Sequence, residues 1–316
     1  MNSIYIEFFG SLGLLVISAN LLLKFVERLS SKIRVSPLII GSTLIAIGTS
    51  LPETSVALSA IAQNVPEISF GNIIGSNIAN VCLILGLGIL VFPVRIGTQK
   101  TQKNNIILLV LTFFFIALLF VPQAQRSMYG IGLIVFYLVF LVVELFWGKM
   151  GSLKEDRKTL AKMKKPKGSV FIYLIGIIGS LFGLILSSKY LVSSAVLISK
   201  ILKVSDETIG LTVIALGTTL PELATTIISG INKDWKLLYG NIQGSTVYNL
   251  SVIGFLLIVF GNNTQAINPF ALTIMAGTTV AIIILSHKYE GTHIPRAYGL
   301  MFLAIYALYI LKLYKT

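Results

Sequence analysis

The sequence predicts an all-α polytopic membrane protein with ten transmembrane helices, arranged as two inverted five-helix repeats with broken helices at the midplane. Three observations support this fold class. The 316-residue chain is 55% hydrophobic, 12% charged and has a mean hydropathy of +0.88, which is too apolar for a water-soluble domain of this length. It contains ten long apolar runs, and one block of sequence, residues 41–80, recurs in the second half as residues 210–249.

The ten apolar runs fall into two groups of five. They cover residues 4–26, 38–64, 68–91, 106–121 and 129–147, then 170–199, 209–232, 237–260, 267–287 and 297–314. A helix needs about 20 residues to cross a hydrocarbon core about 30 Å thick, so the fourth run is short, and we expect the long sixth run to tilt or extend past the membrane. The first run is too long for the apolar region of a signal peptide, and we expect it to be retained.

A long basic segment separates the two groups. We therefore expect a first five-helix repeat over residues 1–147, a linker over 148–169 and a second, inverted repeat over 170–316. If the N-terminus lies outside, 19 of the 25 Lys and Arg residues fall in cytoplasmic segments. The positive-inside rule then predicts a plasma-membrane protein with both termini outside and a cytoplasmic linker. The same rule explains the net charge of +13, and we expect contact with the lipid bilayer and no nucleic acid.

The odd number of runs in each half forces the second repeat to enter the membrane the other way up. Such inverted repeats are typical of secondary transporters, which build two alternative half-open states around one site. The two copies of the block, 41–80 and 210–249, align without a gap at an offset of 169 residues. Their matches are mostly Gly, Thr, Pro, Glu, Ser and Asn, whereas packing alone would favour Leu and Ala, so the repetition indicates preserved chemistry.

Four polar residues lie near the middle of apolar runs: Glu53 and Asn80 in the first half, Glu222 and Asn249 in the second. The other acidic residues, Glu144 among them, fall in loops or close to the ends of runs. A charge at the bilayer centre costs at least about 2.5–3.5 kcal/mol. Since these spans carry no Lys or Arg to pair with the glutamates, a bound cation is expected. Protonated glutamates hydrogen-bonded between helices would be the alternative, but they would not explain the surrounding Gly, Pro, Thr and Asn.

Proline and glycine predict breaks in the helices that carry the two glutamates. Pro52 and Pro221 each obstruct the carbonyl four residues earlier, at Gly48 and Gly217. Freed carbonyls, hydroxyls, amide oxygens and carboxylates are hard oxygen ligands, and Ca²⁺ takes about 6–8 of them. Two ionised glutamates balance one Ca²⁺ or two Na⁺, so the two ions are expected to compete for one site.

The neighbouring spans repeat a Gly-Asn…Gly-Ser motif. Its glycines suit close packing of helices. Ser76 and Ser245 each lie one helical turn before the central asparagine of their span and share its helix face, which favours ion ligation over a plain helix contact. Gln243 is either a further ligand or half of an interhelical hydrogen bond. One cysteine and two histidines exclude a disulfide framework and a histidine cluster. No nucleophile–base set or phosphate loop suggests an enzyme.

The paired motifs GTSLPE with GNIIGSNIAN, and GTTLPE with GNIQGSTVYN, resemble the cation/Ca²⁺ exchanger superfamily, specifically its prokaryotic Na⁺/Ca²⁺ exchangers. The resemblance covers essentially the whole chain. It implies a secondary active antiporter that exchanges Ca²⁺ for Na⁺ by alternating access, functional as a monomer and without a cofactor, in which spans one and six slide against the rest. It implies that the ions are bound by Glu53, Glu222, Asn80, Asn249, Thr49, Ser50, Thr218, Thr219, Ser76, Ser245, Ala46 and Ala215.

The sequence departs from this family pattern at Asn249, where many relatives carry Asp, and at Thr219, where Ser is usual. The first difference removes one ionisable group, so a Ca²⁺/H⁺ or K⁺-assisted exchanger of the same fold stays open. A channel or a non-transporting cation sensor is the alternative of another class, although neither gives the inverted repeat a purpose.

Overall fold

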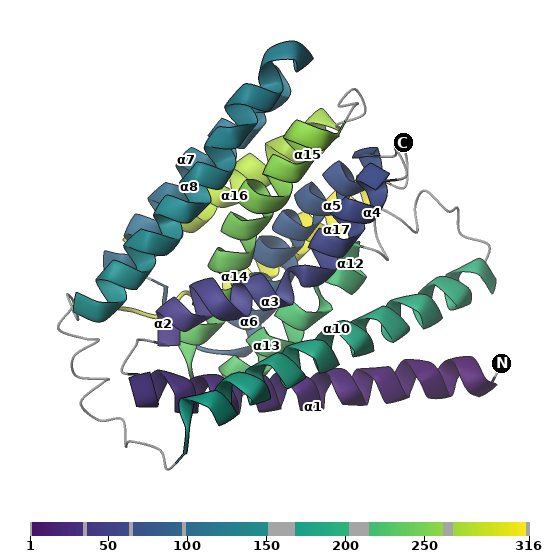
Figure 1. The fold of residues 1–316 in the computed structure, drawn as a ribbon, viewed down its shortest axis with the longest axis vertical. Coiled ribbons are helices and arrows are strands. Elements are labelled where there is room, and N and C mark those ends of the chain that lie inside the picture. The colour runs from purple at the N-terminus through teal and green to yellow at the C-terminus, as the bar shows by residue number, and fades with distance from the viewer. Residues whose placement is uncertain are drawn as a thin grey trace.

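The computed structural model describes residues 2–33, 37–62, 66–96, 99–150, 168–201, 215–261 and 268–313, and these are mostly helical (Figure 1). Most of the expected linker over 148–169 lies outside the described residues, as does the beginning of the run over 209–232, with Gly210, Thr212 and Ile214 of the repeated block.

The described helices follow the order of the apolar runs. The first half contains α1 (Asn2–Ile33), α2 (Pro37–Ile40), η1 (Gly41–Ile45), α3 (Ala46–Thr49), α4 (Leu51–Ala62), α5 (Pro66–Ile78), η2 (Ala79–Leu85), α6 (Gly86–Val91), α7 (Gln99–Leu119) and α8 (Gln123–Met150). The second half contains α10 (Val170–Ile201), α12 (Ala215–Thr218), α13 (Leu220–Ile231), α14 (Trp235–Tyr248), η4 (Asn249–Ile253), α15 (Gly254–Phe260), α16 (Pro269–Lys288) and α17 (Arg296–Leu313). The segments labelled η are π-helical turns.

Within the described residues, eight helices are long and apolar enough to cross a membrane. Large apolar side chains cover the outer faces of several of them, for example Phe113 of α7, Val135 of α8 and Ile178 of α10. An outward apolar face suits lipid, because a helix satisfies its own backbone hydrogen bonds. The chain is therefore a polytopic membrane protein. Helix α13, Leu220–Ile231, counts only as a shorter apolar helix, and the run over α2–α4 is divided, so the ten-span arrangement stays a prediction.

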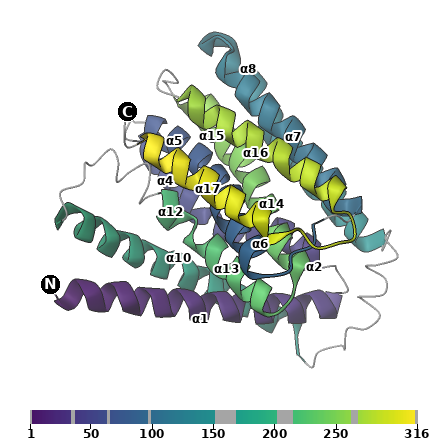
Figure 2. The same ribbon diagram turned by 180° about the vertical axis from the view of Figure 1, so that it is seen from behind.

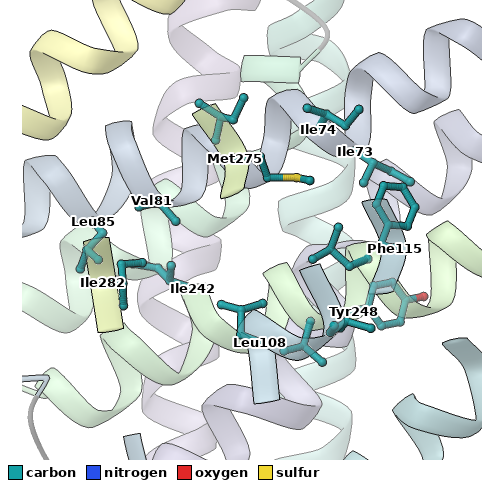
Figure 3. Packing of buried hydrophobic residues seen from close by; sticks show 14 of the residues in the cluster. Ile73, Ile74, Val81, Leu85, Leu108, Phe115, Ile242, Tyr248, Met275 and Ile282 are labelled. Atoms are coloured by element: carbon teal, nitrogen blue, oxygen red, sulfur yellow. The ribbon is translucent and has the colours of Figure 1, made fainter. Parts of the chain in front are cut away.

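The spans that carry Asn80 and Asn249 form the centre of the bundle. In an 18-residue window of Ser69–Val91 and of Trp235–Phe260, 83% and 78% of the helix is buried, against 44% or less in the other six. Their apolar side chains, Ile73, Val81 and Ile242 among them, belong to one large hydrophobic cluster (Figure 3).

A second, smaller hydrophobic cluster joins α1 to α10. It is built mainly from the apolar residues of these two helices, such as Leu22 and Leu184, with a few from η1, α13 and α14. The two helices run side by side along one edge of the molecule, and α7 and α8 occupy the opposite edge (Figures 1 and 2). The two helices thus share an apolar interior, which also joins them to the neighbouring helices.

Both glutamate-bearing helices are interrupted at equivalent positions. Ser50 ends α3 with φ −88° and ψ 10°, and Thr219 precedes α13 with φ −85° and ψ 1°. These two residues are repeat partners, and each lies two positions before the proline of its motif. The interruption is shallow, because the Ser50 N–H still reaches the Ala46 carbonyl at 3.1 Å.

The central asparagines lie in π-helical turns that the sequence analysis did not predict. Asn80 is the second residue of η2, and its repeat partner Asn249 is the first residue of η4. A π-helical turn leaves the local backbone bonded differently from an α-helix and is found frequently at functional sites. The two halves therefore share this irregularity as well as their motifs.

Candidate cation site

Two carboxylates lie at the centre of the candidate site. Glu53 and Glu222 are each 0% exposed and stand in the first turn of α4 and α13, immediately after the two breaks. Ser50, three residues before Glu53, donates to Glu222 Oε1 at 3.2 Å, so the beginnings of the two helices lie against each other. The positive end of a helix favours a negative charge in its first turn, which offsets part of the cost of burying each carboxylate.

The Glu222 carboxylate is held by hydroxyls from both halves of the chain. Its Oε1 accepts hydrogen bonds from Ser50 Oγ at 3.2 Å and from Ser245 Oγ at 3.1 Å. Its Oε2 has no hydrogen-bond partner among the described residues, and neither does either oxygen of Glu53. Three fully buried carboxylate oxygens are thus left without a donor.

Amide and hydroxyl oxygens of the central helices are also unsatisfied. In the described part of the chain, Asn80 Oδ1, Asn249 Oδ1 and Ser76 Oγ have no partner. Asn249 is oriented by its Nδ2, which donates to Asn77 Oδ1 at 3.3 Å. Together with the carboxylates, six buried oxygens lack a donor. A buried acceptor without a partner is costly, so these six oxygens are candidate ligands for a cation.

The threonines at the breaks take part in bonds between the halves. Thr49 Oγ1 donates to Asn241 Oδ1 at 3.2 Å and lies 3.3 Å from Ser245 Oγ. Thr218 Oγ1 donates to Asn72 Oδ1 at 3.2 Å. These two bonds are repeat partners, and each runs from one half to the other.

For three of the predicted ligands, Thr219, Ala46 and Ala215, none of the hydrogen bonds that the structure describes runs to the two carboxylates. Thr219 Oγ1 donates to the Leu216 carbonyl of its own segment. The Ala46 carbonyl already accepts the Ser50 N–H, and Ala215 is described only as the first residue of α12. Their role as ligands stays a prediction.

The donor set favours a hard cation. Among the described residues no group of three or more His, Cys, Asp and Glu side chains could hold a metal ion. Carboxylate, amide and hydroxyl oxygens suit Ca²⁺ and Na⁺, whereas transition metals favour nitrogen and sulfur ligands.

A family comparison agrees with this chemistry. The family model described as sodium/calcium exchanger protein matches residues 3–146 and 172–315, almost the entire chain. The chain belongs to the sodium/calcium exchanger protein family. The prediction of the cation/Ca²⁺ exchanger superfamily is therefore confirmed.

Relatives of this family member span its full length. The putative antiporter CaxA of Alkalimonas amylolytica is 31% identical over 281 residues, which cover 87% of each chain. The sodium/calcium exchanger MaX1 of Methanosarcina acetivorans is 26% identical and covers 95% of each chain. A solved structure of the sodium-calcium exchanger NCX_Mj, soaked with Na⁺ and Ca²⁺, superposes with a TM-score of 0.80 at 26% identity and covers 96% of each chain.

The sequence left Gln243 as either a further ligand or half of an interhelical hydrogen bond, and the structure shows such a bond. Its Nε2 donates to Asn105 Oδ1 of α7 at 2.7 Å, and the Tyr239 hydroxyl donates to the same oxygen. The Gln243 side chain thereby joins α14 to α7.

Glu144 is a third buried carboxylate, which the sequence analysis did not predict. It ends the span Gln125–Glu144, as expected, but it is 0% exposed. Its Oε1 accepts from Asn104 Nδ2 at 2.7 Å, and its Oε2 accepts from Ser42 Oγ at 3.0 Å. Sequence position placed it near a span end but could not show that η1 and α7 enclose it.

Three further asparagines in the site were not predicted as functional. Asn72 and Asn241 accept the threonine hydroxyls, and Asn77 orients Asn249. Asn72 and Asn241 are identical repeat partners in the duplicated motif, so a signal for them was available. Asn77 has Thr246 as its repeat partner and gave no such signal.

Proposed function

We propose that the protein is a secondary active antiporter that exchanges Ca²⁺ for Na⁺ across the membrane by alternating access. The observation that carries this proposal is the pair of fully buried glutamates, Glu53 and Glu222, with three carboxylate oxygens left without hydrogen-bond partners among the described residues. The names of MaX1 and NCX_Mj as sodium/calcium exchangers support the choice of ions.

The charge of the site explains why transport would be an exchange. With both glutamates ionised, the site carries two negative charges, which one Ca²⁺ or two Na⁺ neutralise. Moving an empty, doubly charged site through a low-dielectric barrier is costly, so the protein would change its open side only when loaded. Ca²⁺ and Na⁺ then compete for the same oxygens and must leave by turns. The ions are substrates of this process, which needs neither a cofactor nor an enzymatic step.

The proposed arrangement in the membrane follows the duplication. Ten spans form two inverted repeats over residues 1–147 and 170–316, with the linker 148–169 in the cytoplasm and both termini outside the plasma membrane. In this proposal the ion is bound by the two glutamates together with Thr49, Ser50, Thr218, Thr219, Ser76, Ser245, Asn80, Asn249, Ala46 and Ala215. A monomer holds the complete site, and α1 with α10 slides against the remaining helices.

The test is Ca²⁺ uptake into proteoliposomes that contain the purified full chain. Uptake of ⁴⁵Ca²⁺ is measured under separate Na⁺, K⁺ and H⁺ gradients, and we expect an outward Na⁺ gradient to drive it. Uptake that follows a pH gradient without Na⁺ would identify Ca²⁺/H⁺ exchange, and a K⁺ requirement would identify K⁺-assisted exchange. Current that needs no counter-ion would identify a channel.

Substitution of the glutamates links the activity to the site. We expect Glu53→Gln and Glu222→Gln each to abolish Na⁺-driven uptake, because each removes one of the two charges that balance Ca²⁺. Glu290→Gln is the matched control, since Glu290 is an exposed acid after α16, and it should transport normally. Normal exchange by either buried variant would contradict the proposal.

A further inference from the structure

Asn72 and Asn241 occupy equivalent places behind the threonines of the site. They are 169 residues apart, and each is almost fully buried, with 2% and 1% of its surface exposed. Asn241 accepts the hydroxyl of Thr49 from the other half, and Asn72 accepts that of Thr218, both at 3.2 Å. The same contact is therefore made twice with the halves exchanged.

A hydroxyl that coordinates a cation must send its hydrogen elsewhere, because the hydrogen is positively polarised. Besides the Glu222 carboxylate, which is itself a proposed ligand, the Thr49 hydroxyl has three oxygens in reach: Asn241 Oδ1 at 3.2 Å, Ser245 Oγ at 3.3 Å and the Ala46 carbonyl at 3.4 Å. The last two are themselves proposed ligands. Donation to Asn241 leaves both of them, and the lone pairs of Thr49, available to an ion.

The amide of Asn241 is fixed in the orientation that this donation needs. Its Nδ2 donates to Thr225 Oγ1 at 2.7 Å, and Thr225 in turn donates to the Glu222 carbonyl at 2.9 Å. The chain of bonds thus runs from Thr49 through Asn241 and Thr225 to the backbone of Glu222. Rotating the amide by half a turn would place an N–H against the Thr49 hydroxyl and break two bonds.

The first half lacks the last link of this chain. The repeat partner of Thr225 is Val56, which has no hydroxyl. In the part of the chain that the structure describes, Asn72 Nδ2 correspondingly has no hydrogen-bond partner. Asn72 meets Thr218 as Asn241 meets Thr49, but its Nδ2 has no acceptor in the described structure that would fix the orientation of the amide.

We propose that Asn72 and Asn241 are positioning residues, which take the hydrogens of Thr218 and Thr49 so that these hydroxyls face the transported cation. Thr225 makes the Asn241 arm the more firmly oriented of the two. This inference rests on the proposed function, since it assigns how that ion site is held in shape. It also makes the inverted halves unequal at a defined pair of positions, Val56 and Thr225.

A double-mutant cycle tests whether Asn241 acts through Thr49. The apparent Ca²⁺ affinity of Na⁺-driven uptake is measured for the wild type, Asn241→Ala, Thr49→Val and the double variant, with Ca²⁺ binding in detergent as a second readout. We expect each single variant to weaken affinity by about fivefold to tenfold, the cost of about one hydrogen bond. The double variant should be no more than about twofold weaker than either single one. Multiplied effects would overturn the proposal, and Asn72→Ala with Thr218→Val repeats the test.

Milder variants keep the proposal testable if an alanine variant does not fold. Thr225→Val and Val56→Thr exchange side chains of nearly the same shape, and each makes one half resemble the other. We expect Thr225→Val to weaken apparent Ca²⁺ affinity about threefold and Val56→Thr to strengthen it about twofold. Thr273→Val, at an exposed position on α16, is the control and should change nothing. Changes of the same sign in the two variants, or no change, would overturn the proposal.

The outcomes distinguish a failure of the proposed function from a failure of the positioning role. A wild-type protein that shows no Na⁺-driven Ca²⁺ uptake contradicts the proposed function. A wild-type protein that exchanges the ions, but whose Asn241 and Thr49 variants act independently, contradicts only the positioning role.

Discussion

At the scale of single residues, Glu53 and Glu222 are repeat partners with unequal surroundings. Glu222 accepts two hydroxyls, from Ser50 and Ser245, whereas both oxygens of Glu53 lack partners in the described structure. The repeat partner of Ser50 is Thr219, which donates to the Leu216 carbonyl instead. Glu53 therefore depends more than Glu222 on a bound cation to satisfy its carboxylate.

This difference predicts how ions stabilise the protein. Ca²⁺ bound only to the folded state raises its melting temperature by mass action. We expect Glu53→Gln to lose this Ca²⁺-dependent shift and, without ions, to melt at or above the wild-type temperature, because one of two buried like charges is gone. Thermal unfolding of the detergent-solubilised protein with and without Ca²⁺ measures both. A full Ca²⁺ shift in the variant would show that Glu53 is not a ligand.

Asn249 adds no pH response of its own to the site. Its amide carries no titratable proton, and its Oδ1 is an unpaired acceptor in the described structure. Asn249→Asp would add a third carboxylate beside the two glutamates. We expect tighter apparent Ca²⁺ binding at pH 8 and a steeper fall of uptake toward pH 6, because protons then compete at one more carboxylate. Parallel pH profiles for the variant and the wild type would contradict a position facing the ions.

Sequence reasoning could identify the polar residues of the site but not their hydrogen bonds. The cost of burying a charge singled out Glu53 and Glu222, and duplication singled out Asn80 and Asn249. Which hydroxyl bonds which carboxylate depends on side chains that meet from helices far apart in sequence. The role of Asn77 is of this kind, because its bond to Asn249 joins residues 172 positions apart.

At the scale of helices, the breaks were predictable and the π-helical turns were not. Proline and glycine act through local backbone geometry, so the sequence alone places an interruption close to Ser50 and Thr219. The turns η2 and η4 contain apolar residues with no local helix-breaking signal. Their bonding is determined by how the two central spans pack against their neighbours.

The close approach of α14 to η1 predicts a position where only glycine fits. A Cβ on Gly244 would lie 2.6 Å from Ser42 Cα and 2.7 Å from Ala46 Cβ, and it would also overlap the Ser42 carbonyl oxygen. Backbone atoms cannot move aside as a flexible side chain can. We expect Gly244→Ala to destabilise the protein by about 1–3 kcal/mol and to reduce exchange.

The matched control for Gly244→Ala is Gly277→Ala in α16, where nothing lies within 4 Å of the added Cβ. Thermal unfolding and ⁴⁵Ca²⁺ uptake are measured for both variants. Gly277→Ala should be neutral or slightly stabilising, because alanine favours a helix more than glycine does. Equal effects of the two substitutions would contradict the role of close approach.

At the scale of the whole molecule, the apolar interior is divided into two clusters. One joins α1 to α10, and the other fills the rest of the bundle. The succession of apolar runs predicted a five-plus-five plan, whereas the pairing of α1 with α10 came only from the family resemblance. No local pattern reports that these two spans will meet across the 136 residues, 34–169, that separate them.

The apolar cluster that α1 and α10 share predicts that this pair moves as one body during exchange. Leu181 of α10 meets Gly48 of α3, with 3.0 Å between a Cβ built on Gly48 and the Leu181 Cγ. In a Cys82→Ala background, we expect a disulfide between Gly48→Cys and Leu181→Cys to stop exchange, because it ties α10 to the remaining bundle. Reduction should restore the uptake of ⁴⁵Ca²⁺.

A disulfide inside the pair is the control. A Cβ on Gly183 of α10 lies 3.2 Å from the Ser18 Cβ of α1, close to the separation that a disulfide needs. The variant with Ser18→Cys and Gly183→Cys should take up ⁴⁵Ca²⁺ equally well with the disulfide formed and with it reduced. Inhibition by both disulfides would contradict movement of α1 and α10 together.

The hydrogen bonds from Thr49 to Asn241 and from Thr218 to Asn72 also bear on the origin of the chain. Each half supplies a hydroxyl that bonds an asparagine of the opposite half, so one half alone does not complete this arrangement. A half-length ancestor would have built this arrangement by inserting into the membrane in both orientations. Two oppositely oriented copies would then have paired as an antiparallel dimer. Fusion of two such genes would have fixed the partners in one polypeptide, after which each copy was free to diverge.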